Sequence, residues 1–314
     1  MNTPLKYIVL QIEKTLIGLE YYWQILKMKL KFMPFYRFKN YITYNKMIIS
    51  YHAQGRLGNN IFQYIAVKVV QKYVKQLGFN CEYKFNERVK YWFSEFNYRQ
   101  LYDLLVLSTI NRENLNSLIH FLSNNWFFDG FYQFDYHIIN EREFIRSLFT
   151  PENEERINEN YRVCDIVNNI MKYKPSFDSE DIVTHVRLDD FINVGILDHT
   201  NVSKIIKESG LKGEVYVVCD KLKKDFEKKY MDDFKKDTDF TLVSNEDMFK
   251  DLAYLWYAPN LLCNNSTFCW IAGILGECKK SWCPVNKGKH SPQNFERVKE
   301  DTITYEWDEL PMKS

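Results

Sequence analysis

The sequence predicts an α/β protein built on parallel, doubly wound sheets. From residue 181 to about 275, short apolar segments alternate with helical segments, which is the order of consecutive strand–helix units. These apolar segments are continuous, as is typical of strands buried on both faces. With 314 residues, the chain is long enough for one large domain or two ordinary ones.

The first strand–helix unit begins after residue 45. Residues 46–53 form an apolar strand, a glycine-rich segment follows, and a periodic apolar helix is expected over 61–77. The N–H groups at the start of such a helix favour phosphate, and Gly55 and Gly58 let the backbone approach a ligand closely. A plain strand–helix connection, whose glycines only make the turn, is the alternative interpretation.

Residues 81–122 are expected to be mostly helical, and residues 126–133 form a strand that ends in a loop. The second half is more regular. Its expected strands are 181–186, 214–219, 240–243 and 260–263, and its expected helices are 201–209, 221–230, 245–257 and 266–275. An outer helix and a loose end are expected after Pro284.

Polar side chains follow three strands of the second half. They are His185, Arg187, Asp189 and Asp190 after the first strand, Asp220 after the second, and Asn264, Asn265, Ser266 and Thr267 after the fourth. The carboxyl ends of such strands open onto the ligand crevice. Arg187 can hold a phosphate with a two-pronged hydrogen bond. Ser266 and Thr267 can cap a helix or donate to a diphosphate. Asp251 is either a solvated helix residue or a buried acceptor for guanine N1 and N2.

Composition excludes several classes of protein. The net charge of +1 provides no field to attract nucleic acid. The 7 cysteines are odd in number and lack C-x-x-C spacing, which favours free, buried thiols in a reducing compartment, so a cytoplasmic location is expected. The motifs of P-loop kinases, zincins and serine hydrolases are absent, and no convincing metal site is present.

Residues 1–45 are expected to form an amphipathic helical extension. Apolar residues follow helical spacing, but charges such as Glu13, Glu20 and Lys27 interrupt the roughly 18–20 apolar residues that a membrane span needs. The basic end of this helix could lie peripherally on a membrane or pack on its own domain.

Five segments occur in one order along the chain: GRLGNNIFQY (55–64), GFYQ (130–133), HVRLDDF (185–191), VVCD (217–220) and CNNSTFCW (263–270). Together they resemble glycosyltransferase family 11, the α-1,2-fucosyltransferases. The resemblance implies a GT-B-like architecture: an N-terminal Rossmann-like domain on the acceptor side (46–175) and a C-terminal Rossmann-like domain that binds the donor (176–314). It also implies inverting, metal-independent transfer of L-fucose from GDP-fucose to a sugar hydroxyl, α-1,2 onto a galactose-type acceptor. The partners are then a nucleotide-sugar donor and a glycan acceptor, with no cofactor.

The resemblance assigns roles to individual residues. Arg187 would bind the β-phosphate and stabilise the leaving GDP, and His185 would contact the guanosine side. Gly55, Gly58 and Asn59 would lie at the phosphate–fucose junction, and Asp251 would bind guanine. Ser266 and Thr267 would hold the phosphates, and Asp220 and Phe268 are further implied donor-binding residues.

The chain departs from the family pattern at two positions and leaves the general base open. Leu188 stands where the family has a second Arg, and Asp189 where it has Gly. An inverting transfer needs a carboxylate near the acceptor hydroxyl. Asp190 is the candidate base and Asp189 the alternative, although either could instead brace His185 or Arg187. Another linkage, acceptor or nucleotide-sugar, or a catalytically silent binding protein, is the alternative function.

Overall fold

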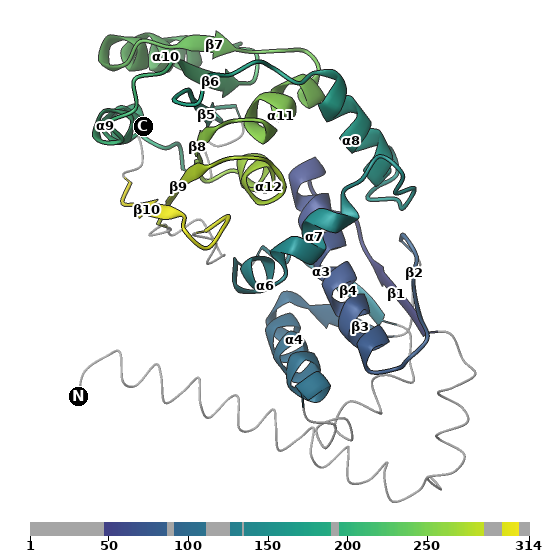
Figure 1. Ribbon diagram of the computed structural model, residues 1–314. Helices are drawn as coiled ribbons and strands as arrows, with labels where there is room; N and C mark the ends of the chain where they lie inside the picture. Colours follow the sequence, from purple (N-terminus) through teal and green to yellow (C-terminus); the bar gives the residue numbers. More distant parts are fainter. Residues whose placement is uncertain are drawn as a thin grey trace, which may run out of the picture.

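The computed structural model describes residues 47–86, 91–110, 126–133, 135–189, 195–285 and 297–307. These residues form two parallel β-sheets flanked by helices, so the predicted α/β class is confirmed (Figure 1). The expected helical extension at residues 1–45 lies outside the described residues. Among the residues that are described, no helix is long and apolar enough to cross a bilayer.

The smaller sheet has four parallel strands in the order β2-β1-β4-β3. The strands are β1 (Met47–Tyr51), β2 (Cys81–Tyr83), β3 (Tyr91–Ser94) and β4 (Trp126–Asp129), and the helices beside them are α3 (Leu57–Gln76) and α4 (Glu95–Ile110). The expectation of a mostly helical segment over 81–122 was wrong for β2 and β3. Strands of three and four residues are too short to produce a readable period.

The larger sheet has six parallel strands in the order β10-β9-β8-β5-β6-β7. The strands are β5 (Ile182–Val186), β6 (Val215–Cys219), β7 (Thr241–Val243), β8 (Asn260–Leu262), β9 (Lys280–Pro284) and β10 (Ile303–Tyr305). Counted from β5, the order from β7 to β10 is 3-2-1-4-5-6, that of a Rossmann sheet. In the described part of the chain after Pro284, the structure contains strand β10 where an outer helix was expected.

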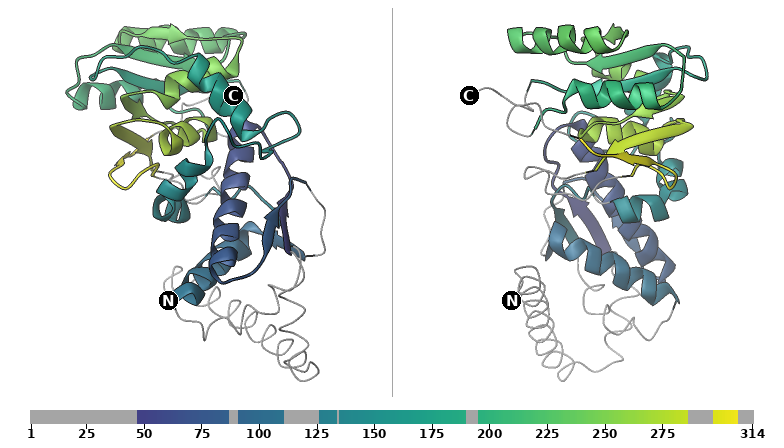
Figure 2. Two further views of the ribbon diagram at one scale, coloured as in Figure 1. Left: turned by 45° about the vertical axis from the view of Figure 1, so that its right-hand side comes forward. Right: turned by 90° about the vertical axis from the view of Figure 1, so that its left-hand side faces the viewer.

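Helices lie on both faces of the larger sheet (Figure 2). They are α9 (His199–Glu208), α10 (Asp225–Asp237), α11 (Met248–Trp256) and α12 (Thr267–Leu275). Several helix starts differ from expectation, and α10 begins at Asp225 where a helix over 221–230 was expected. Helix α3 begins at Leu57, so Gly58 belongs to its first turn, because burial of that turn outweighs the poor helix propensity of glycine and asparagine. Helix α11 is capped by Asp247, whose side chain accepts from the N–H of Phe249.

The apolar core is shared between the two sheets. One cluster includes Ile49 of β1, Phe62 of α3, Leu261 of β8 and Ile271 of α12. A second cluster covers the opposite face of the larger sheet, where α9 and α10 pack. All seven cysteines are free and buried, as expected. The continuous first core holds α3 and α12 together.

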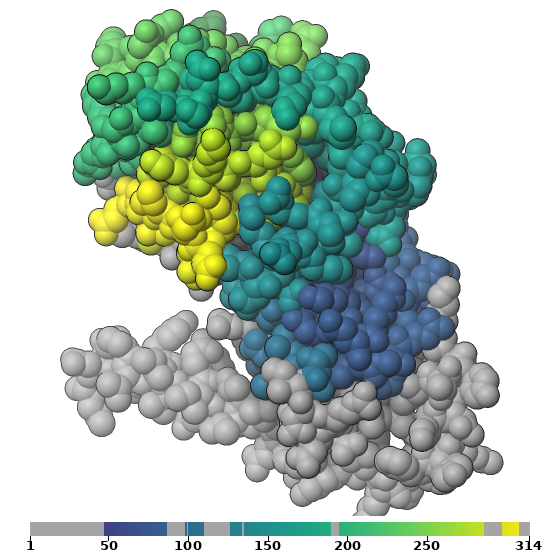
Figure 3. All heavy atoms as spheres, in the orientation of Figure 1, coloured from purple at the N-terminus to yellow at the C-terminus, as the bar shows by residue number. Residues whose placement is uncertain are grey.

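Three further helices connect the sheets: α6 (Asp135–Asn140), α7 (Arg142–Leu148) and α8 (Val163–Lys172). In Figure 3 the teal residues of α6 and α7 lie between the blue and the yellow-green parts of the molecule. Helix α8 precedes the expected domain boundary at residue 175 but packs on α11 of the second half. Just before α8, the ring of Tyr161 lies 5.2 Å from that of Phe249 in α11, centroid to centroid. The exact domain boundaries stay a prediction.

Candidate functional site

The polar segments gather at the switch points of the two sheets. In the larger sheet the strand order reverses between β5 and β8, and His185 and Asn264 lie at the carboxyl ends of these strands. In the smaller sheet β1 and β4 are neighbours, and Gly55 and Gly130 follow them. Ligands bind outside the carboxyl ends of strands at such points.

The first turns of α3 and α12 touch each other. A Cβ atom added to Gly58 would lie 2.8 Å from Thr267 Oγ1 and 3.0 Å from the backbone N of Phe268, so only glycine fits. Neither helix carries an acidic residue in its first turn, and the N-cap residues Arg56 and Ser266 make no side-chain cap hydrogen bond. Two positive helix ends therefore meet with no carboxylate of their first turns to neutralise them.

Two buried polar atoms at this junction have no hydrogen-bond partner among the described residues: Ser266 Oγ and His185 Nδ1. Ser266 does not cap α12 with its hydroxyl, and its own N–H donates to Asn264 Oδ1 at 3.0 Å. Leaving such groups unsatisfied costs free energy that a polar ligand would recover.

His185 is neutral at physiological pH. Burial lowers its pKa to about 3, and the charge of Arg187 contributes to the same shift. The ring of His185 lies 5.7 Å from the ring of Phe268, centroid to centroid. One small pocket touches His185, Arg187 and Asn264, so the histidine, the arginine and the residues after β8 lie together.

Leu188 and Asp189, which follow Arg187, do not line the small pocket that Arg187 lines. Leu188 is 2% exposed and packs with Val186 in the second core, on the face of the sheet away from α12. Asp189 accepts a hydrogen bond from Lys224 Nζ at 2.9 Å. Asp190, the candidate base, lies outside the described residues. The departure at Leu188 therefore falls in the hydrophobic core, while half-buried Arg187 lies at the pocket.

Asp251 is a buried carboxylate beside the end of β6. Burial raises its pKa to about 6, and the nearby charge of Asp220 adds to the increase. Asn245 Nδ2 donates to Asp251 Oδ1 at 2.6 Å, which holds the carboxylate in place. Asp220 itself is exposed. Strands β5 and β6 are neighbours, so the end of β6, which Asp220 follows, lies beside the end of β5, which carries His185.

Amide side chains connect the glycine-rich segment to the end of β4. Gln133 Nε2 donates to Asn59 Oδ1 at 2.9 Å, and Gln63 Nε2 donates to the carbonyl of Gly130 at 2.8 Å. Gly55 has a φ of 75°, and a Cβ there would lie 2.3 Å from the Asn59 amide. Positive φ and the close approach both require glycine at this position.

A pocket of about 440 Å³ opens beside the glycine-rich segment. Its lining includes Gly55 and Asn60 from that segment, Asn158 and Tyr161 from the connection before α8, and Met248 at the start of α11. Amide groups can both donate to and accept from hydroxyl groups. Arg56 and Glu159 also line this pocket, which is therefore suited to a polar ligand with several hydroxyl groups.

Most of the expected site residues come together where the first turns of α3 and α12 meet, between the two sheets. Gly58, Thr267 and Phe268 are in contact, His185, Arg187 and Ser266 surround them, and Asp220 and Asp251 form the adjacent corner. Sequence reasoning missed the supporting roles of Asn264 and Asn245. An asparagine two residues before a helix start is a known local capping pattern, which could have indicated the first.

Within the described ranges, no group of three or more His, Cys, Asp and Glu side chains could hold a metal ion. Metal independence itself stays a prediction.

No protein-family model matches this chain, and no curated protein matches it in sequence, so membership of glycosyltransferase family 11 stays a prediction. The solved structures that resemble it include two that are bound to GDP. One is POFUT1 in complex with GDP, with 12% identity and a TM-score of 0.42, over 74% of this chain and 95% of that chain. The other is a mutant of Arabidopsis thaliana FUT1 in complex with GDP, with 13% identity and a TM-score of 0.41, over 82% of this chain and 76% of that chain.

Proposed function

We propose that this protein is an inverting glycosyltransferase that moves L-fucose from GDP-fucose to a sugar hydroxyl, with α-1,2 linkage to a galactose-type acceptor. The observation that carries the proposal is the junction of α3 and α12. Two uncapped helix starts, the unpartnered Ser266 Oγ and the unpartnered His185 Nδ1 converge beside Arg187. Backbone N–H groups, a hydroxyl and a guanidinium together match the chemistry of a diphosphate. The choice of fucose, galactose and linkage rests on the five sequence segments that resemble family 11.

In this proposal the donor lies across the carboxyl ends of β8, β5 and β6. Its diphosphate occupies the junction of α3 and α12, and its guanine lies at Asp251. Ionised Asp251 accepts from guanine N1–H and N2–H, while Asn245 fixes the orientation of the carboxylate. Neutral His185 adds no charge of its own, so Arg187 remains the cation that faces the phosphates.

The transfer is a direct displacement at C1 of the donor sugar. The acceptor hydroxyl oxygen forms a bond to C1 as the bond from C1 to the β-phosphate oxygen breaks, and the electron pair leaves with GDP. Arg187 stabilises the charge that develops on this oxygen. A carboxylate takes the proton of the acceptor hydroxyl. We assign this role to Asp190, because Asp189 is already paired with Lys224.

The acceptor is assigned to the pocket of about 440 Å³ beside Gly55. Its amide side chains suit the hydroxyls of a neutral sugar, and Tyr161 adds an aromatic wall. It adjoins the glycine-rich segment, which also contacts α12, so donor and acceptor would meet at that segment.

The test is GDP release from GDP-fucose in the presence of a galactoside, for the natural chain and for Arg187→Ala. Turnover that is lost in the variant supports the enzyme. Tight GDP binding without turnover across a donor and acceptor array would indicate a binding protein instead. Activity is expected to persist in EDTA, and a loss that manganese restores would contradict the mechanism based on Arg187.

A further inference from the structure

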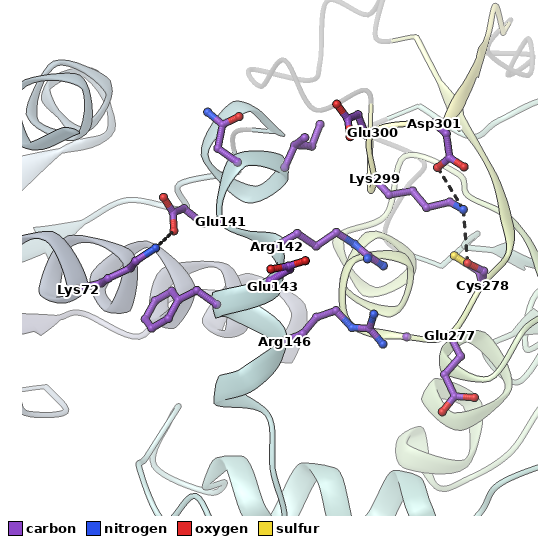
Figure 4. Close-up of a pocket in the computed structure, with 14 residues that line it drawn as sticks. Lys72, Glu141, Arg142, Glu143, Arg146, Glu277, Cys278, Lys299, Glu300 and Asp301 are labelled. Atoms are coloured by element: carbon purple, nitrogen blue, oxygen red, sulfur yellow. Dashed lines mark hydrogen bonds and ion pairs between the residues drawn. The ribbon is translucent and has the colours of Figure 1, made fainter. Parts of the chain in front are cut away.

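A second cavity lies at the opposite end of α12 from the candidate site. It has a volume of about 1130 Å³ and lies between α7, the segment that follows α12, and residues 299–301 (Figure 4). Helix α12 has nine residues, so its two ends are about 12–14 Å apart at 1.5 Å per residue. The groove, as we call this cavity, is therefore separate from the junction of α3 and α12.

Two arginines extend side by side from α7 into the groove. Arg142 and Arg146 are four residues apart and point in the same direction, toward Cys278 (Figure 4). Arg142 Nε is buried without a hydrogen-bond partner among the described residues. Burial lowers the pKa of Arg142 and the charge of Arg146 lowers it further, while Cys278 and Asp301 oppose the shift only in part. Each guanidinium therefore makes the charged state of the other less favourable.

Five acidic residues line the groove, and two of them, Glu141 and Asp301, are paired with lysines. Glu141 accepts a hydrogen bond from Lys72 at 2.6 Å and another from Tyr73. Asp301 forms an ion pair with Lys299 at 3.2 Å. The side chain of Glu277 points away from both arginines in Figure 4. Among the described residues, neither Arg142 nor Arg146 forms an ion pair with a carboxylate. Glu143 and Glu300 also line the groove and are exposed to solvent.

We propose that the groove binds a phosphate-bearing ligand, with its phosphate held between Arg142 and Arg146. Two guanidinium groups offer paired N–H donors that match phosphate oxygens, and a dianion would relieve their mutual repulsion. The groove is far larger than a phosphate group and is within the size range of small-molecule sites. Its lining is mostly charged, so the rest of the ligand is polar, as in a sugar phosphate. This inference does not depend on the proposed transferase activity.

The experiment measures binding to the full chain by calorimetry, with GDP present in excess to occupy the donor site. The probes are inorganic phosphate and glucose 1-phosphate. The natural chain is expected to bind one equivalent of each, with glucose 1-phosphate the tighter. Arg142→Gln and Arg146→Gln are each expected to weaken binding by about tenfold or more, in line with the loss of a charge-assisted hydrogen bond. Lys212→Gln, which removes one exposed positive charge away from the groove, is the matched control and should bind normally.

The outcomes are decisive in both directions. Unchanged affinity in both arginine variants, or no phosphate binding by the natural chain, overturns the proposal. Equal affinity for the two probes overturns the assignment of a polar body to the ligand. Arg187→Ala should retain phosphate binding at the groove, and its loss there would mean that the phosphate occupies the donor site instead.

Thermal unfolding separates binding from a structural role. In the absence of phosphate, the Tm of Arg142→Gln is expected to equal or exceed that of the natural chain, because the repulsion from Arg146 is removed. Phosphate should raise the Tm of the natural chain and leave that of the variant unchanged. A Tm that falls without phosphate would show that Arg142 supports the fold, and would contradict the proposal.

Discussion

The two anion sites that we propose, one at each end of α12, differ in the groups that they offer. At its N-terminus the groups are short and fixed: backbone N–H groups, the buried hydroxyl of Ser266, and a contact with Gly58 that leaves no room for a Cβ. At its C-terminal end the groups are long side chains in an open groove. The first site depends on shape, because any added or displaced atom changes the backbone packing. The second depends on charge, because flexible side chains can adjust to a change of shape.

The largest expected effect is at Arg187, where charge and shape are both needed. Arg187→Ala is expected to lower kcat by about 10³, which is the cost of removing a fixed group that stabilises transition-state charge. Arg187→Lys should recover only a small part, because an ammonium lacks the planar fork. In the groove, Arg142→Lys should keep phosphate affinity within a few-fold.

The two Arg187 variants are compared by steady-state GDP release, and Arg142→Lys is measured by phosphate calorimetry. Full recovery of kcat by lysine at position 187 would show that charge alone is sufficient there. The contrast between the two ends of α12 would then be lost.

The next effect concerns pH at the guanine corner. Asp251 has a pKa of about 6 in the folded chain, above its usual value, so the folded state holds a proton between about pH 4 and 6 that the unfolded state releases. Asp251 therefore lowers stability as pH rises through this range. Guanine needs the ionised carboxylate, so GDP affinity is expected to fall as pH drops below about 6.

Asp251→Asn tests this assignment directly. The variant should bind GDP roughly 30–100-fold more weakly at pH 7.5, as expected for a lost hydrogen-bonded charge. It should keep only the pH dependence that comes from the terminal phosphate of GDP, whose pKa is also about 6, so its profile should be shallower than that of the natural chain. Asp232→Asn, an exposed carboxylate on α10, is the control and should keep the natural profile. Calorimetry from pH 5 to 8 is the measurement, and an unchanged profile in Asp251→Asn would remove guanine from this corner.

The sequence predicted the regular half of the fold, and it predicted which strand ends carry polar residues. Parallel strands bring their carboxyl ends to one edge, so the neighbourhood of His185, Arg187 and Asp220 followed from the strand–helix alternation alone. The short strands β2 and β3 could not be predicted, because three or four residues show no period. Strand β10 was missed although Ile303, Thr304 and Tyr305 favour a strand, because three residues show no period and only the pairing with β9 places them in the sheet.

The site details that were missed all depend on tertiary contacts. Gly58 was expected in a loop, but it lies in a helix whose first turn is packed against Thr267, more than 200 positions away in the sequence. Ser266 was expected to cap a helix or bind phosphate. Its N–H donates to Asn264, and its buried hydroxyl has no hydrogen-bond partner among the described residues. Leu188 raised a question about the donor, and its burial in the second core places it away from the site.

A smaller effect is expected at the contact between the helices. Gly58→Ala would place a Cβ 2.8 Å from Thr267 Oγ1 and 3.0 Å from backbone atoms of α12, so the two helix starts must move apart. The expected cost is about 1–3 kcal/mol of unfolding free energy, as for other overpacked sites, together with a clear loss of GDP affinity. Gly78→Ala is the matched control. Unlike Gly58, Gly78 has a positive φ, of 90°, so alanine there strains the backbone, but its Cβ would meet nothing within 4 Å.

Denaturant unfolding and GDP calorimetry on both glycine variants provide the measurement. Both are expected to lose stability, and only Gly58→Ala should lose GDP affinity. If the two variants lost affinity equally, the contact between α3 and α12 would have no specific part in binding.

The smallest effect is expected at Ser266, and it distinguishes a binding group from a structural one. Ser266→Ala removes a buried hydroxyl that has no partner, so the free chain should be equally stable or slightly more stable. Its affinity for GDP should fall about fivefold, equivalent to roughly 1 kcal/mol for one neutral hydrogen bond. Ser203 provides the matched control, because its buried hydroxyl accepts from Thr238 Oγ1 at 2.7 Å. Ser203→Ala should lower stability by about 1–2 kcal/mol and leave GDP affinity unchanged. If Ser266→Ala behaved like Ser203→Ala, its hydroxyl would serve the fold, and the junction of α3 and α12 would lose the group that most specifically marks it as a phosphate site.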